Sequence, residues 1–251
     1  MKYAVGVAIV IATVSLAVSS SRSQTSVIQQ NSVSVNHEGT SVTISGQTVS
    51  VDTSTTGRRV IGDGQPASET RPIGPVAAIA ADGAFAVTVK VGPSAGLTIE
   101  TDKNLLPIVK TDVANGRLDI YTDKSYSVDV RIKVTVTSPD VSDISASGSN
   151  QINGEGLAGG PLTVSLNGSN TAVLTGNVSA LTAHMSGSNR LSAQQLTADS
   201  ANITISGSGH AVVDARRQIV AQVSGAGSIA VYGNPQARST EVNGAGKITF
   251  E

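Results

Sequence analysis

Ser147-Gly148-Ser149-Asn150 is the first copy of a short pattern that returns five times between Val141 and Glu251. The later copies are Asn167-Gly168-Ser169-Asn170, Ser186-Gly187-Ser188-Asn189, Ser206-Gly207-Ser208-Gly209, Ser224-Gly225-Ala226-Gly227 and Asn243-Gly244-Ala245-Gly246. The motif glycines are separated by 20, 19, 20, 18 and 19 residues. Self-similarity at a nearly fixed period of this size is typical of a repeat architecture, in which one coil of chain is wound again and again.

The residues around each motif glycine alternate between apolar and polar. Eleven of the twelve positions two and four residues before the glycines are apolar. The residue between them is polar in all six copies, and in the third copy it is a His. In the third copy these residues are Ala183, His184 and Met185. Alternation with period two predicts a half-buried strand. Because the apolar pattern resumes four residues after the glycine, each repeat predicts a strand, a tight corner, a second strand and a return loop.

The motif residues themselves are typical of tight corners. Gly and Asn tolerate positive φ better than other residues do. Six corners in register favour coils that stack with each strand parallel to its predecessor, about 4.8 Å apart. The expected fold is therefore all-β, a parallel β-solenoid of about 19-residue coils. Ser147, Asn150, Asn170 and Asn189 could form a polar binding ladder, but turn chemistry and side chain to backbone hydrogen bonds explain them without a ligand.

The first 23 residues are typical of a signal peptide. Lys2 supplies a positive start, Tyr3 to Val18 is mainly apolar, and a Ser-rich stretch follows. The apolar run is short for a membrane span, which needs about 20 residues. We expect cleavage between Ala17 and Ser23, with retention as an uncleaved anchor as the alternative. The mature protein would then be periplasmic, exposed on the cell surface or secreted.

Two further regions precede the repeats. Residues 24–74 are polar and of low complexity, with a few short strand-like stretches and an expected linker from Pro66 to Pro75. Residues 75–140 are rich in strand patterns, among them a long regular one from Ser127 to Thr137. Because we find no corner motif in 75–140, we expect a wider opening β layer that covers the first of the six coils in 141–251. Together 75–251 form one solenoid domain.

Composition excludes several classes of function. The chain has 17 basic and 18 acidic residues, a net charge of -1, so it lacks the concentrated basic composition expected for nucleic-acid binding. It has no Cys, which excludes disulfides, thiol catalysis and a lipid-anchored amino terminus. With no Trp, four Tyr and two Phe, it has few aromatic platforms for sugars.

Residue types that carry chemistry are scattered. The three histidines, His37, His184 and His210, fall in the polar segment, on an outer strand face and at a corner, and no pair has metal-ligand spacing. Asp119, Asp123 and Asp129 could converge on calcium, although three scattered acids are weak grounds for a site. We therefore assign no catalytic, cofactor-binding or metal-binding residue.

Four segments resemble the auto-transporter adhesin head GIN domain family. They are Gly116-Arg117-Leu118-Asp119-Ile120, Val134-Thr135-Val136-Thr137-Ser138-Pro139, Ile203-Thr204-Ile205-Ser206-Gly207-Ser208-Gly209 and Val242-Asn243-Gly244-Ala245-Gly246-Lys247-Ile248. The resemblance covers about Arg71 to Glu251, and it departs from the family in the first three corners, where Asn replaces a second Gly. It implies an exported bacterial chain with an opening β layer and a parallel β-solenoid. It brings no catalytic residues.

These observations favour an exported, non-enzymatic module for adhesion, or for binding or structure in the cell envelope. The partner could be an envelope polysaccharide or a surface protein. The alternative is an enzyme or lectin that acts on polysaccharide from a β-helix scaffold, which would need clustered acids. Lys247 to Glu251 closes the last coil without a capping helix, so the end of the solenoid could also pair with a second copy.

Overall fold

The computed structural model describes residues 33–35, 41–44, 47–50 and 59–251. The chain divides into two units, Met1–Ser54 and Thr55–Glu251. In the first unit, β1 (Val33–Val35), β2 (Ser41–Ile44) and β3 (Gln47–Ser50) form an antiparallel meander. The export segment and His37 lie outside the described residues. No helix within those residues is both long and apolar enough to cross a membrane.

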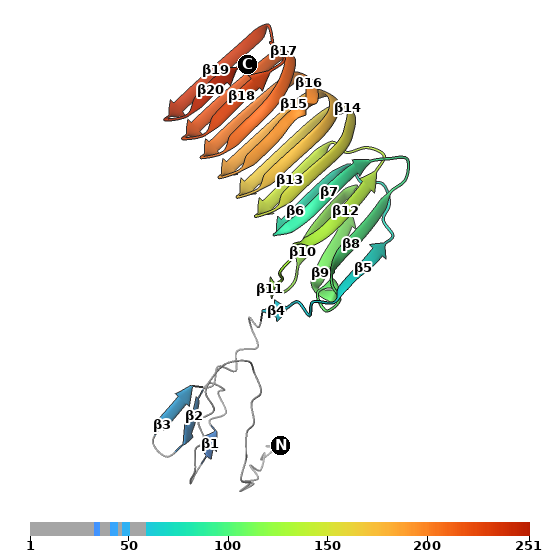
Figure 1. Cartoon of the computed structure of the whole chain (residues 1–251), viewed down its shortest axis with the longest axis vertical. Helices are drawn as coiled ribbons and strands as arrows, with labels where there is room; N and C mark the ends of the chain where they lie inside the picture. The colour runs from blue at the N-terminus through green and yellow to red at the C-terminus, as the bar shows by residue number, and fades with distance from the viewer. Residues whose placement is uncertain (1–32, 36–40, 45–46, 51–58) are drawn as a thin grey trace, which may run out of the picture. The chain divides into compact units, whose positions relative to one another are not determined.

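The second unit is the predicted parallel β-solenoid (Figure 1). Its coils are formed by long strands that bend around the molecule and pair in parallel with the next coil. The expected return loops are themselves strand-like, interrupted only by shifts in register. The coil strands are β13 (Asp143–Gly148), β14 (Gln151–Gly168), β15 (Thr171–Gly187), β16 (Arg190–Gly207), β17 (His210–Gly225), β18 (Ser228–Tyr232), β19 (Ala237–Gly244) and β20 (Lys247–Phe250).

All six motif glycines have positive φ and stack on one another in register. The inward residues that the alternation predicts are buried along the whole stack, from Ile144 to Val231. This column of aliphatic side chains is continuous with the core of the opening layer. The six corners and their spacing are therefore confirmed.

The opening layer contains a seventh corner, which the sequence analysis did not find. Strands β6 (Ala78–Gly83) and β7 (Phe85–Val91) meet at Gly83, which pairs with Gly148 and has a φ of 143°. The expectation that 75–140 lacks such a corner is thus wrong. The corner was hidden because Asp82-Gly83-Ala84-Phe85 has Phe where the repeats have Asn or Gly, and because 65 residues separate it from the next corner.

The intervening residues add strands in both directions: β10 and β12 pair in parallel with β6 and β7, and β9 and β8 then pair antiparallel with β10 and β12. They form β8 (Gly96–Asp102), the 3-10 helix η1 (Leu106–Ile108), β9 (Val109–Ala114), β10 (Arg117–Thr122), β11 (Tyr126–Ser127) and β12 (Ile132–Ser138). β9 and β10 form a hairpin around Asn115 and Gly116, both of positive φ. The strand order of the sheet consequently ends in β9, and β8 lies antiparallel to β12 on a branch of the same sheet.

The long strand expected from Ser127 to Thr137 begins only at Ile132. Ile132 pairs with Phe85, the first residue of β7 after the Gly83 corner. Upstream of this pair, no strand among the described residues pairs with Val128 or Val130, and Val130 is 65% exposed. An alternating pattern was present, but its partner strand was not.

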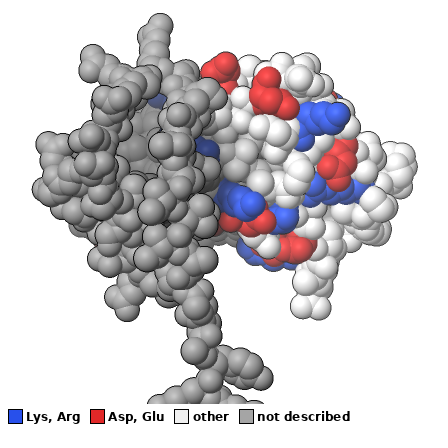
Figure 2. Space-filling view, turned by 90° about the horizontal axis from the view of Figure 1, so that it is seen from below, with Lys and Arg blue, Asp and Glu red and all other residues white. Residues whose placement is uncertain are grey.

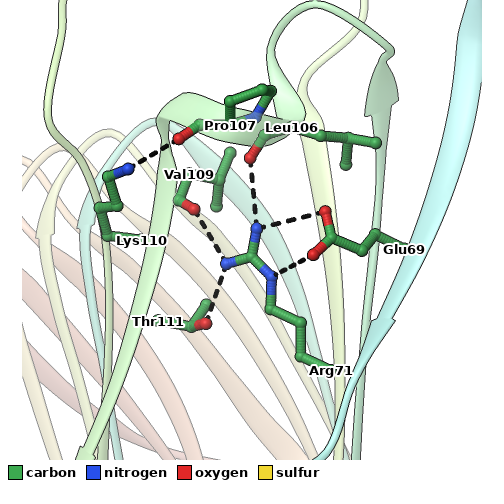
Figure 3. Close-up of polar contacts among 7 residues, drawn as sticks. All are labelled: Glu69, Arg71, Leu106, Pro107, Val109, Lys110 and Thr111. Carbon is green, nitrogen blue, oxygen red and sulfur yellow. Dashed lines mark hydrogen bonds and ion pairs between the residues drawn. The ribbon is translucent and has the colours of Figure 1, made fainter.

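The expected linker from Pro66 to Pro75 is also wrong. β4 (Val60–Ile61) pairs with β11, and β5 (Pro66–Arg71) pairs antiparallel with β8. Arg71 fixes this edge strand, because its guanidinium donates to the carbonyl oxygens of Leu106 (3.2 Å) and Val109 (2.9 Å), to Thr111 Oγ1 (2.9 Å) and to the carboxylate of Glu69 (Figure 3). The solenoid unit therefore includes residues that composition alone assigned to a linker.

Candidate functional site

The Asn residues of the first three corners are structural, as turn chemistry predicted. Asn150, Asn170 and Asn189 are at most 2% exposed. Asn170 Nδ2 donates to the carbonyl oxygen of Asn167 at 2.7 Å, and its Oδ1 accepts from the backbone N–H of Asn150 at 2.8 Å. The same contacts link Asn170 to Asn189. Their amide groups are thus hydrogen-bonded inside the protein, and the ladder offers no binding surface.

The last three corners replace the Asn ladder with Gly and a branched aliphatic residue. Two positions before the corner, Ala146, Leu166 and Met185 give way to Ile205, Val223 and Val242. A Cβ on Gly227 would lie 2.7 Å from Ile205 Cγ2, and one on Gly246 would lie 2.4 Å from Val223 Cγ1. The branched methyl groups therefore fill the space that the Asn side chains use in the earlier coils.

A surface groove lies where β10, β6 and β13 run side by side. We call it the β6 groove; its volume is about 450 Å³. Register explains it, because Ala80 on β6 lies between Asp119 on β10 and Ser145 on β13. A methyl group between larger side chains leaves a trough. The polar residues that line it are Asp82, Arg117, Asp119, Tyr121, Ser145, Ser147 and Asn167.

Hydrogen bonds hold one wall of the β6 groove in place. Arg117 Nε donates to Asp119 Oδ1 at 2.8 Å, and this bond raises the pKa of Arg117. Tyr121 Oη donates to Asp112 Oδ2 at 2.7 Å, and that hydrogen bond, followed by the charge of Asp112, raises the pKa of Tyr121. The aromatic side chain of Tyr121, at 37% exposure, is therefore fixed beside carboxylate and guanidinium groups.

The opposite wall carries hydroxyl and amide groups. Ser147 and Asn167 are exposed and stand at the same place before successive corners. Ser145 Oγ donates to Asp143 Oδ1 at 3.1 Å. The groove thus offers hydrogen-bond donors and acceptors on both sides and one aromatic surface. Such a surface fits a ligand with many hydroxyl groups.

The three acids considered for calcium do not converge. Asp119 pairs with Arg117, and Asp123 pairs with Lys110 at 3.1 Å. Asp123 and Asp129 both line a second hollow of about 730 Å³, together with basic residues such as Arg59, whereas Asp119 lies in the β6 groove. No group of three or more His, Asp or Glu side chains suited to a metal ion occurs among the residues that the structure describes. On the face seen in Figure 2, basic and acidic residues are interspersed.

The histidines lie apart from the β6 groove. His184 is exposed between Ser165 and Thr204 of neighbouring coils, as the repeat register predicted. His210 is the first residue of β17, and its Nδ1 lies 2.6 Å from Ser228 Oγ. His210 and Ser228 lie opposite each other in register on the neighbouring strands β17 and β18. No carboxylate among the described residues is bonded to His210, so within this part of the chain the pair lacks the third member of a catalytic triad.

A family model matches residues 77–235, well over half of the chain; its description is "Putative auto-transporter adhesin, head GIN domain". The chain belongs to this family. The matched residues include the β6 groove and five of the six motif corners, and the resemblance seen in the sequence is confirmed. No curated protein matches this GIN-domain chain in sequence.

The solved structures that match include one from Bacteroides fragilis and one from Parabacteroides distasonis. A "putative adhesin" from Bacteroides fragilis is 21% identical, covers 76% of this GIN-domain chain and 100% of its own length, and has a TM-score of 0.63. A "putative lipid binding protein" from Parabacteroides distasonis is 20% identical, covers 77% of this chain and 100% of its own, and has a TM-score of 0.47. At this identity the first likeness supports the fold alone.

Proposed function

We propose that this protein is an exported, non-enzymatic binding module that acts in adhesion or in the cell envelope, and that its β6 groove binds polysaccharide. Membership of an adhesin-like family and the export pattern of Met1 to Ser23 support the location at the surface, in the periplasm or outside the cell. The single observation that carries the ligand class is the position of Tyr121 beside the polar side chains of the groove.

The groove suits a sugar chain better than an apolar ligand. Carboxylate, hydroxyl and amide groups, here Asp82, Ser147 and Asn167, can each exchange hydrogen bonds with sugar hydroxyls. The ring of Tyr121 offers a flat apolar surface to a sugar face. The groove is open, so a long polysaccharide could lie in it without a free end. Binding of this kind needs no movement of the solenoid.

The arrangement of the acids favours binding over hydrolysis. A glycosidase uses a pair of carboxyl groups, one of which must donate a proton to the leaving group. Asp119 is paired with a guanidinium, and its side chain is 43% exposed. Asp119 Oδ1 already accepts a hydrogen bond from Arg117 Nε, so this carboxyl group is engaged within the protein.

The test is binding of the purified mature protein to a panel of envelope glycans, with mass spectrometry of any products. We expect saturable retention without product, weakened by Tyr121→Ala and by Asn167→Ala. Asn243→Ala is the matched control, because Asn243 holds the same place before the last corner and is also exposed, far along the stack from the groove.

Equal retention by the groove variants and the parent would reject this groove as the site. Release of shortened glycans that depends on Asp82 or Asp119 would instead support the enzyme alternative. Retention of surface proteins but of no glycan would replace polysaccharide with protein as the partner.

A further inference from the structure

The last coil exposes side chains that the preceding coil buries. Val242 and Phe250 are 41% and 36% exposed, whereas Val223 and Val231, which hold the same places one coil earlier, are each 1% exposed. β20 lies at the end of its ladder and pairs only with β18 among the described strands. The outer edge of β20 therefore offers backbone hydrogen-bonding groups beside an apolar surface, which is a template for another strand.

The sequence of β20 is complementary to itself. Ile248 and Phe250 face the interior of the solenoid, and Lys247, Thr249 and Glu251 alternate with them on the outer face. If two copies pair antiparallel about a two-fold axis at Thr249, Ile248 of each copy faces Phe250 of the other. Lys247 of each copy then faces Glu251 of the other. The register centred on Thr249 therefore brings the apolar residues of the two copies together and also forms two ion pairs between them.

The charges select that register over its neighbours. A shift of two residues places Lys247 or Glu251 opposite Thr249 and removes both ion pairs. Lys247 and Glu251 are exposed and make no ion pair with another described residue. They are therefore available to a partner, and opposite charges across an antiparallel pair are favourable.

The neighbouring strand β19 is protected against the same pairing. Arg238 occupies the inward place that Ile219 holds in the preceding coil. Its guanidinium lies 4.2 Å from the centroid of the Phe250 ring, and its Nε donates to the carbonyl oxygen of Pro235. An inward-pointing charge is one of the devices that keep an edge strand from pairing. Within the last coil, this favours pairing through β20 over pairing through β19.

We propose that the C-terminal coil is a homodimer surface, on which two copies join antiparallel through β20 with Lys247 of each copy opposite Glu251 of the other. The contact is the same on both copies and uses up the edge of β20 on each, so this interface closes at two copies. This inference is independent of the β6 groove, which lies at the other end of the stack. A strand-sized contact is small, so reversible dimerisation is expected rather than an obligate dimer.

A charge exchange tests the register directly. Sedimentation over a concentration series should show a reversible dimer of the parent, and Lys247→Glu or Glu251→Lys should each raise its dissociation constant about tenfold or more, because like charges then face each other. The double variant restores both ion pairs in reversed sense and should recover the dimer. Lys124→Glu, an exposed loop residue away from β20, controls for the change in net charge.

A cysteine on the two-fold axis gives a second, independent test. The native chain has no Cys, so Thr249→Cys introduces a single thiol that should form an intermolecular disulfide on mild oxidation. Ser206→Cys on a middle coil is the control and should remain largely uncrosslinked. A parent that stays monomeric at every concentration overturns the proposal. A dimer that the single charge variants do not weaken and that Thr249→Cys does not crosslink must use another interface. That result also overturns the proposal.

Discussion

Gly207 turns its corner directly beside Gly187, whose carbonyl oxygen lies 2.6 Å from the place that a Cβ on Gly207 would occupy. The same approach recurs at the other motif corners, so each coil is packed against the backbone of its predecessor. A side chain at this place would clash with the backbone of Gly187. It would also have to adopt a φ of 120°, which residues other than Gly disfavour.

Gly207→Ala should therefore destabilise the protein by about 1 kcal/mol or more, because alanine disfavours positive φ and its methyl group would press on the Gly187 carbonyl. Denaturant titration followed by circular dichroism measures the loss. Gly160→Ala is the control, since a Cβ there meets nothing within 4 Å. Equal midpoints for both variants would contradict the corner geometry.

Asn170→Ala should cost about 1–3 kcal/mol, because the buried backbone N–H of Asn150 loses its acceptor and the part-buried carbonyl oxygen of Asn167 loses a donor. The change in the free energy of unfolding checks this. The exposed Asn177 provides a control of the same chemistry. If Asn177→Ala were as damaging as Asn170→Ala, the buried ladder would not be the cause.

Val223→Asp should unfold the last coils or prevent folding, because it places an unpaired charge at a site that is 1% exposed. Val173→Asp introduces the same group on an outer face, at a side chain that is 41% exposed, and should have little effect. Thermal melting of the two variants compares them. A folded, parent-like Val223→Asp variant would show that this residue does not face the core.

Arg71→Lys should loosen the opening layer, because an ammonium cannot reproduce the fork that joins Glu69 to the carbonyl oxygens of Leu106 and Val109. Hydrogen exchange should rise in β5, η1 and β9 and stay unchanged in the distant coils. Arg190→Lys, at an exposed residue of the distant strand β16, is the control and should leave exchange in these segments unaltered.

Asp112→Asn should lower the pKa of Tyr121 towards its ordinary value, because the hydrogen bond to the carboxylate favours the neutral phenol. Ultraviolet titration of the tyrosinate measures the shift, and the pKa of Tyr126, raised mainly by burial, should not follow. A pKa raised in the folded state stabilises the protein fully below the unfolded value and less as pH rises through the folded value. The contribution of Tyr121 is thus lost only in alkaline solution.

The repeat made the solenoid predictable, because each coil repeats the same short-range pattern of corner and alternation. The corner at Gly83 was not found since its partner strand follows only after an inserted layer, and Phe85 stands where the repeats have Asn or Gly. β5 was missed because its alternation includes charged residues, and Arg71 is half-buried only through contacts to residues some 40 positions away.

The β6 groove could not be read from spacing. Its walls come from Asp119 and Tyr121 on one strand and Ser145 on another, and only the register of both against Ala80 brings them together. The small outward side chain of Ala80 was the one sequence feature that could have indicated a groove. It does so only when the residues beside it on the neighbouring strands, Asp119 and Ser145, are known.

The exchange of the Asn ladder for branched residues has a consequence for how such a chain can change in length. Duplicating or deleting a coil within the Asn half, or within the Gly half, would preserve the fit between neighbours. An Asn coil inserted between Ile205 and Val223 would bring its amide against branched methyl groups. Evolution could therefore add coils inside either half, and each added coil would move the groove and the C-terminal coil apart by about 4.8 Å. Insertion or deletion of a coil at the boundary after Asn189 would be disfavoured.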